Sequence, residues 1–193
     1  MKKKLLTLCV LLFLTAACQL QAQANQEAAM KAWMEYMTPG DIHKMLSKAD
    51  GEWTYEATMW MERGAPAEKS TGTAVNKMIL GGRYQESKYA GNMMGMPFEG
   101  YSLTGYDNAR KVFQSSWVDN MGTGVMQLEG KLNAATKTII STGKMTDAST
   151  GKEIKVRETF TMIDDNTQKL EMYDTREGGK EFKTMEITFK RKG

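Results

Sequence analysis

The chain has few of the residues that carry most covalent and metal chemistry. Its 193 residues include two cysteines, Cys9 and Cys18, and one histidine, His43. Because both cysteines lie near the N-terminus, a chain processed beyond them has no disulfide, no thiol nucleophile and no cysteine metal site. His43 precedes the strand-rich part of the sequence, with no cysteine or serine elbow to accompany it. We therefore expect His43 to pack in a helix, and we expect no catalytic residues.

The chain also lacks a surplus of charge. Lys2, Lys3 and Lys4 account for the whole formal net charge of +3, so the sequence after them is formally neutral. A protein that binds nucleic acid or another polyanion usually has a basic surplus. Nucleic acid is accordingly not an expected partner.

No apolar run is long enough to cross a bilayer. The run from Leu5 to Ala17 is shorter than the roughly 20 residues of a transmembrane helix. The three lysines precede it, and Ala22-Gln23-Ala24 follows it, with small residues at −3 and −1 of a cut after Ala24. This arrangement is typical of a bacterial secretory signal peptide. It predicts that residues 1–24 are removed and that the mature protein is periplasmic or secreted.

Leu14-Thr15-Ala16-Ala17-Cys18 offers a second way to process the same segment. Small residues before a cysteine resemble a lipobox, in which the cysteine becomes the lipidated N-terminus, although Thr15 stands where leucine is usual. Lipidation at Cys18 would place the protein on a membrane of the cell envelope. Both forms stay open, and contact with a membrane is expected only for the lipidated one.

Beyond residue 24 the chain divides into a helical and a strand-rich part. Residues 25–50 combine good helix formers with an apolar stripe, which Pro39-Gly40 interrupts. Residues 51–193 alternate short runs rich in Thr, Val, Ile, Tyr, Phe and Met with turn signals. The sequence predicts an all-β fold, a single antiparallel barrel of about ten strands with a short N-terminal helical segment. The expected strands are 52–62, 71–79, 83–90, 97–107, 111–119, 122–131, 136–145, 153–164, 167–175 and 180–191.

A period-2 alternation separates the two faces of these strands. Trp53, Tyr55 and Ala57, for example, alternate with Thr54 and Glu56. A barrel of this size can enclose one small molecule, with a glutamate as its polar anchor. The candidates for a ligand-binding interior are Met59, Met61, Tyr101, Trp117, Met126, Glu158 and Met172. The alternative is a filled interior in which these residues only pack and Glu158 pairs with a basic neighbour.

Methionine is unusually frequent, at 17 residues. Met59-Trp60-Met61 and Met93-Met94-Gly95-Met96 have the spacing of exported copper-handling motifs, and thioethers select Cu(I). Methionine also fills irregular interiors, and Met59 and Met61 share the apolar face of Trp53. Core packing is therefore favoured for that pair, while Met93, Met94 and Met96 remain a weak alternative metal site.

Several phrases, occurring in order along nearly the whole mature chain, resemble the DUF1579 family of bacterial proteins of unknown function. The resemblance implies no catalytic residues, because none is established for that family. The phrases are Met37-Thr38-Pro39-Gly40 with His43, Gly51-Glu52-Trp53, Met78-Ile79-Leu80-Gly81-Gly82-Arg83-Tyr84, Met94-Gly95-Met96-Pro97-Phe98-Glu99-Gly100, Leu103-Thr104-Gly105-Tyr106-Asp107-Asn108, Trp117-Val118-Asp119-Asn120-Met121-Gly122-Thr123-Gly124, and Gly178-Gly179-Lys180-Glu181 with Met185-Glu186-Ile187.

A broader similarity is to the calycins, the lipocalin and fatty-acid-binding barrels. Gly51-Glu52-Trp53 resembles the lipocalin G-x-W, which implies that Trp53 closes the barrel floor under a basic residue of the last strand. Arg191 is the expected basic residue, because it shares a strand face with Phe189 and would there lie over Trp53 in a cation–π contact. The haem site of the nitrobindin barrels is not implied, because their proximal histidine has no match in these strands.

The function that these patterns favour is that of an exported, non-catalytic protein that binds a small apolar or amphipathic ligand in its barrel. One alternative is an envelope interaction or scaffold protein with a filled core. The other is methionine-based copper binding. The sequence identifies no cofactor and no oligomeric state.

Overall fold

The computed structural model describes the backbone of residues 2–176 and 178–193, with side chains from residue 21 onward and at Gln19. It divides into two compact units, Met1–Thr38 and Pro39–Gly193. The first unit contains helix α1 (Lys2–Met37), within which the expected signal segment falls. The Cys18 side chain, the expected lipidation site, lies outside the described residues. Over the described part of the chain, no helix has both the length and the hydropathy to cross a membrane.

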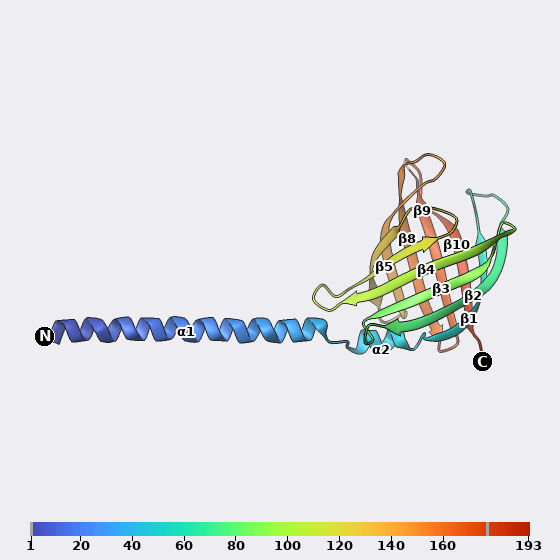
Figure 1. Ribbon diagram of the computed structural model, residues 1–193. Coiled ribbons are helices and arrows are strands. Elements are labelled where there is room, and N and C mark those ends of the chain that lie inside the picture. The colour runs from blue at the N-terminus through green and yellow to red at the C-terminus, as the bar shows by residue number, and fades with distance from the viewer. Residues whose placement is uncertain (1, 177) are drawn as a thin grey trace. The chain divides into compact units, whose positions relative to one another are not determined.

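The second unit is a closed barrel in which every neighbouring pair of strands is antiparallel (Figure 1). Its order, β1-β10-β9-β8-β7-β6-β5-β4-β3-β2, is that of consecutive hairpins closed by β1 against β10. This confirms the expected all-β barrel of ten strands. The strands are β1 (Gly51–Met59), β2 (Glu68–Ile79), β3 (Tyr84–Met93), β4 (Met96–Asp107), β5 (Val112–Asp119), β6 (Met126–Asn133), β7 (Thr138–Thr146), β8 (Glu153–Asp164), β9 (Thr167–Thr175) and β10 (Phe182–Arg191).

The largest difference from the expected strand boundaries is at the start of β6. β6 begins at Met126, whereas the sequence pattern placed its start at residue 122. Gly122-Thr123-Gly124 lies in the loop instead. Glycine in a strand gains no side-chain packing and costs backbone entropy, so these residues favour the connection over the ladder.

Helix α2 (Asp41–Ser47) belongs with the barrel and not with α1. The Gly40 N–H donates to His43 Nδ1 at 3.1 Å, and the His43 ring lies edge-on to Tyr106 at 6.0 Å. Leu46 is buried with Phe113 and Ile139. The expected helical segment 25–50 is therefore divided near Pro39, because the face of α2 that carries His43 and Leu46 finds its partners on the strands.

Trp53 and Arg191 close the end of the barrel beside α2. Trp53 is fully buried, and its indole Nε1 donates to the Ala49 carbonyl at 2.9 Å. Arg191, its Cα partner across β1 and β10, places Cζ 4.3 Å from the centre of the indole ring. The arginine fork donates to the carbonyls of Lys48 and Asp50. This is the floor arrangement that the G-x-W resemblance implies, and it ties α2 to both ends of the barrel sequence.

Glycines on the inner face make room for large aromatic rings. A Cβ at Gly72 or Gly91 would lie about 2.5 Å from the Tyr55 ring or hydroxyl, and one at Gly100 would lie 2.5 Å from the Trp117 ring. Each ring therefore rests directly on the backbone of a neighbouring strand. Small residues at these positions set how far the rings extend into the interior.

Candidate functional site

Strand register decides which of the expected site residues face the interior. Cα partners in an antiparallel ladder share a face of the sheet, and Trp53 marks the inner face. From Trp53 the inner row passes through Ala74 and Tyr89 to Gly100. The same rule applied around the barrel places five of the expected residues inside: Met59, Trp117, Met126, Glu158 and Met172.

Two expected lining residues lie elsewhere. Tyr101 follows Gly100, so it lies on the outer face of β4, where its hydroxyl donates to Glu86 Oε1 at 3.1 Å. Met61 lies in the loop beyond β1 and is 57% exposed. Neither residue lines the interior, and their assignment to it was wrong.

Glu158 is the most unusual group inside the barrel. It lies on β8 between Ser141 of β7 and Met172 of β9. Burial alone raises its pKa to about 7, because no hydrogen bond or ion pair to a described residue offsets the loss of water. The neighbouring cation, Arg157, faces outward and binds Glu181 instead. The pairing of Glu158 with a basic neighbour that a filled core would need is therefore not made.

Tyr89 faces Glu158 across the interior. β3 and β8 stand five strands apart in either direction around the ten-strand barrel, so they form opposite walls. Burial, followed by the charge of Glu158, raises the pKa of the Tyr89 hydroxyl.

An aromatic cluster surrounds Tyr89. Its ring meets Trp117 edge to face at 5.0 Å and Tyr55 at 6.3 Å, and Phe98 stacks on Trp117 at 6.3 Å. Trp117 Nε1 donates to Asp119 Oδ2 at 2.7 Å. One region of the interior thus combines aromatic faces with two carboxylates, Asp119 and Glu158.

The interior is packed unevenly. Near α2 the inward side chains of Trp53, Phe113 and Phe189 are buried. Further along the strands, inward side chains keep accessible surface despite the closed wall around them: Ser102, Thr104, Ser115, Trp117, Met126, Glu158 and Met172 are all only half-buried. Met126 begins β6, but the others lie within their strands, where a core filled to the usual protein density would leave them little accessible surface.

Methionines form an inward row in the same region. Met59, Met185 and Met172 are successive Cα partners on β1, β10 and β9, so their side chains are neighbours. Met93 and Met96, of the weak alternative metal site, are partners at the β3–β4 turn, which Met94 makes with φ 53°. In the described part of the chain, no three His, Cys, Asp or Glu side chains are grouped to hold a metal ion.

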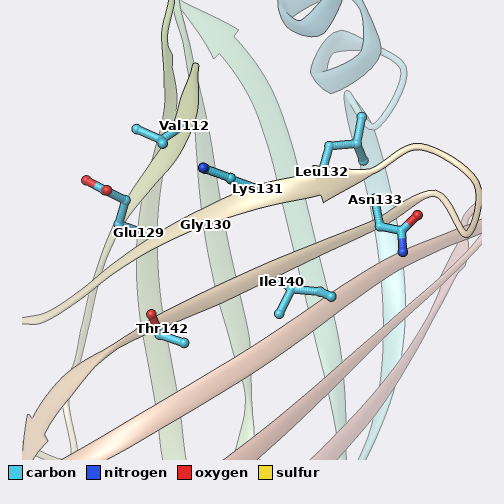
Figure 2. Close-up of a pocket in the computed structure, with 8 residues that line it drawn as sticks. All are labelled: Val112, Glu129, Gly130, Lys131, Leu132, Asn133, Ile140 and Thr142. Carbon is cyan, nitrogen blue, oxygen red and sulfur yellow. The ribbon is translucent and has the colours of Figure 1, made fainter. Parts of the chain in front are cut away.

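The outer wall has a pocket that the sequence analysis missed. It measures about 430 Å³ and lies over β6 and β7 (Figure 2). Lys131 and Glu129 flank apolar side chains of Val112 and Ile140, whose parity directs them outward. The signal available in the sequence was an apolar residue at each of two outward positions.

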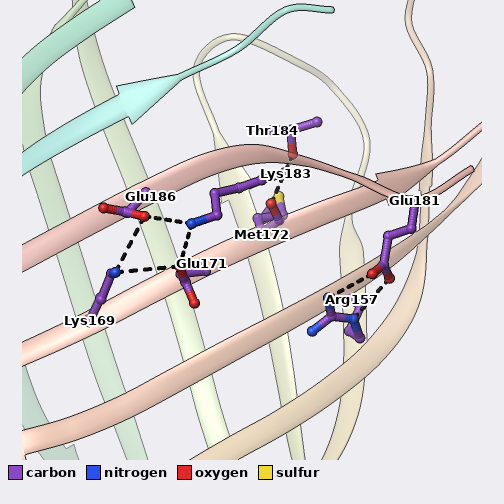
Figure 3. A network of polar contacts seen from close by, with 8 residues as sticks. All are labelled: Arg157, Lys169, Glu171, Met172, Glu181, Lys183, Thr184 and Glu186. Atoms are coloured by element: carbon purple, nitrogen blue, oxygen red, sulfur yellow. Dashed lines mark hydrogen bonds and ion pairs between the residues drawn. The ribbon is translucent and has the colours of Figure 1, made fainter. Parts of the chain in front are cut away.

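A lattice of charges covers the outer face of β9 and β10 (Figure 3). Lys183 Nζ lies 2.5 Å from Glu171 and 2.7 Å from Glu186, and Lys169 lies 3.4 Å from both carboxylates. Nearby, Arg157 binds Glu181 through two nitrogens. Every charge in this lattice is paired, in contrast to Glu158 on the inner face of the same wall.

The fold defines a closed, ten-stranded antiparallel barrel whose floor is sealed and whose interior holds a carboxyl that no described residue pairs. The family described as "Protein of unknown function (DUF1579)" matches residues 38–191, and the chain belongs to this family. Among solved structures, it is similar to Rv2717c from M. tuberculosis, with a TM-score of 0.62 and 12% identity over 81% of this chain and 100% of that one.

A redesigned β-barrel is also similar, with a TM-score of 0.40 and 13% identity over 77% of this chain and 95% of that one. The comparison with curated proteins finds no match. At such identities, the likeness to Rv2717c concerns the fold alone.

Proposed function

We propose that the protein is exported and binds a small apolar or amphipathic molecule inside its barrel. The observation that carries the proposal is Glu158, a carboxyl inside a closed barrel without a hydrogen-bond or ion-pair partner among the described residues. Glu158 is half-buried, and a carboxyl removed from bulk water costs stability unless a hydrogen-bond partner is supplied. A ligand that reaches Glu158 would supply that partner.

The surroundings of Glu158 support this function. The half-buried inward side chains of Trp117, Met126 and Met172 offer apolar contact, and methionine adapts to ligands of irregular shape. Apolar walls with a few polar groups are typical of small-molecule sites. Export rests on the N-terminal pattern of Lys2–Lys4, the following apolar run and Ala22-Gln23-Ala24.

A second candidate is binding of Cu(I), which the row of Met59, Met185 and Met172 favours. Three thioethers on adjacent strands offer the soft ligands that this ion prefers. This row lies inside the barrel, whereas Met94 and Met96 are largely exposed.

The test is ligand binding by the purified protein. Native mass spectrometry of protein from its own host should show a retained small molecule. Added apolar probes should quench Trp117 fluorescence and raise the melting temperature, because a ligand that binds only the folded state stabilises it. Trp117→Leu should change the affinity, while Trp33→Leu, at a side chain 60% exposed on α1, should not.

The outcomes separate the candidate functions. If lipids, haem and flavins change neither the fluorescence nor the melting temperature, the interior is filled in practice and the chain is better explained as an interaction protein. If Ag(I), a redox-stable substitute for Cu(I), alone raises the melting temperature, and Met185→Leu abolishes that rise, the copper function replaces the proposed one.

A further inference from the structure

The inward face of the barrel has an excess of negative charge. Along the described strands its inward positions include Asp119, Glu158 and Asp174, but a single cation, Arg191. Arg191 lies at the floor, where its fork binds the backbone carbonyls of Lys48 and Asp50 and its Cζ covers Trp53. It is not available to neutralise the three carboxyls.

Asp174 keeps one unsatisfied carboxylate oxygen inside the barrel. It is 5% exposed; the Thr184 side chain hydrogen-bonds its carboxylate and the charge of Arg176 acts on it, but Oδ1 has no hydrogen-bond partner among the described residues. Its Cα partner on β8 is Val156, two residues from Glu158 on the same face. Two carboxyls that can each accept a further hydrogen bond therefore lie diagonally adjacent on the inner wall.

Aromatic rings that attract cations lie on other walls of the barrel than Glu158. Tyr89, on the opposite wall, meets Trp117 of β5 edge to face at 5.0 Å, and the Asp119 carboxylate accepts from the indole nitrogen. Indole and phenol faces bind organic cations through the ring quadrupole, and nearby carboxylates strengthen that attraction. An anionic ligand such as a fatty acid would meet repulsion from both walls.

We infer that the ligand of this barrel is an organic cation with an apolar body, held between the carboxylates of Glu158 and Asp119 and the rings of Tyr89 and Trp117. The inference rests on the proposed function and narrows it from apolar molecules in general to amines and quaternary ammonium compounds. The cation supplies the counter-charge that the inward face lacks. Its apolar body occupies the half-buried region lined by Met126 and Met172.

The test uses three probes with the same decyl chain: decyltrimethylammonium, decanol and decanoate. Binding to the full-length protein is measured at pH 8 by calorimetry and by Trp fluorescence, below the micelle concentration of each probe. The ammonium probe should bind at least about tenfold more tightly than the other two, as one favourable charge contact would give. Glu158→Gln should remove most of that preference. Glu171→Gln, on the outer face of β9, should leave it unchanged.

Asp119→Asn provides a second variant, because its amide oxygen can still accept from Trp117 Nε1, although the bond from the Met121 N–H to the other carboxylate oxygen is lost. It should reduce the preference without unfolding the barrel, which a melting curve checks. Equal or tighter binding of decanol or decanoate would overturn the inference and leave the proposed function standing. A preference that survives both substitutions would also overturn it. If no probe binds, the inference fails; the proposed function fails as well if lipids, haem and flavins also leave the fluorescence and the melting temperature unchanged.

Discussion

Arg191 covers Trp53, with its Cζ 4.3 Å from the indole centre, and its Nε donates to the Asp165 carbonyl at 3.0 Å. With its two bonds to the α2 end, this one side chain joins the first strand, the last strand and the β8–β9 turn. The closure of the barrel and the sealing of its floor are therefore a single local arrangement.

Replacing Trp53 by Ala should lower the free energy of unfolding by about 3–5 kcal/mol, as loss of a large buried aromatic does. The indole is fully buried, and its hydrogen bond to Ala49 is lost with it. Chemical denaturation measures the change. Trp33→Ala, on the exposed side of α1, is the control and should stay within about 0.5 kcal/mol. A loss below about 1 kcal/mol for Trp53→Ala would contradict the floor assignment.

Arg191→Lys should cost about 1–3 kcal/mol, although it preserves the charge. Lysine cannot reproduce the fork that reaches the carbonyls of Lys48, Asp50 and Asp165. Lys192→Gln is the matched control, because Lys192 forms an exposed pair with Glu52 at 3.2 Å. Equal effects of the two substitutions in denaturant titrations would show that the guanidinium contacts with the three carbonyls contribute no more than an exposed ion pair.

Gly100→Ala should displace Trp117 and destabilise the barrel by roughly 1–3 kcal/mol. Its Cβ would lie 2.5 Å from the indole, so the ring has to move into the interior. The Trp fluorescence spectrum should shift, and probe affinity should fall. Gly122→Ala, where a Cβ meets nothing within 4 Å, should change neither. An unshifted spectrum for Gly100→Ala would refute the position given for Trp117.

Glu158 should make the protein less stable as pH rises from about 4.5 to about 7. Its pKa is about 7 in the folded state against an ordinary value of 4.5, so the folded state holds a proton that the unfolded state releases. Relative to Glu158→Gln, the native protein should lose at most about 3 kcal/mol across this window and then level off.

Two other groups give the controls for that titration. Burial lowers the pKa of His43, so its contribution to stability is lost as pH falls through about 6.5, equally in both proteins. The hydrogen bond from Lys183 lowers the pKa of Glu171, so Glu171→Gln should become less costly as pH falls. A pH-independent difference between native protein and Glu158→Gln would mean that Glu158 is solvated.

N-terminal sequencing and intact mass of the protein from the envelope fraction test export. We expect a chain that begins at Asn25, because Ala22 and Ala24 suit the −3 and −1 positions. A chain that begins with acylated Cys18 would establish the lipoprotein form. A chain that retains Lys2–Lys4 would contradict export.

Much of the barrel was predictable because alternation is a local property. β1 presents Trp53, Tyr55 and Ala57 on one face, and β8 presents Val156, Glu158 and Phe160 in the same way. The spacing of turn residues then gave ten strands. The parity shared by Trp53 and Arg191 was readable in the same manner, once the first and last strands were taken to be neighbours.

Tyr101 shows where alternation fails. On β4 the inner positions hold Gly100, Ser102 and Thr104, while Tyr101 and Leu103 lie outside. The small and polar residues of β4 lie inside and its large apolar ones outside, because the inner face needs room for the Trp117 ring, which rests on Gly100. Only pairing with β3 and β5 fixes which face is inside, and a shift of one residue reverses every side chain.

The sequence by itself determined the strand-rich fold, the helical break at Pro39 and the inward direction of Glu158 and Trp117. The tertiary structure alone decided that α2 packs at the floor, that Tyr89 stands opposite Glu158 and that Arg157 binds Glu181 and not Glu158. The reason is physical: the direction of a side chain follows from local backbone geometry, whereas its pKa and its partners depend on strands that closure of the barrel brings together.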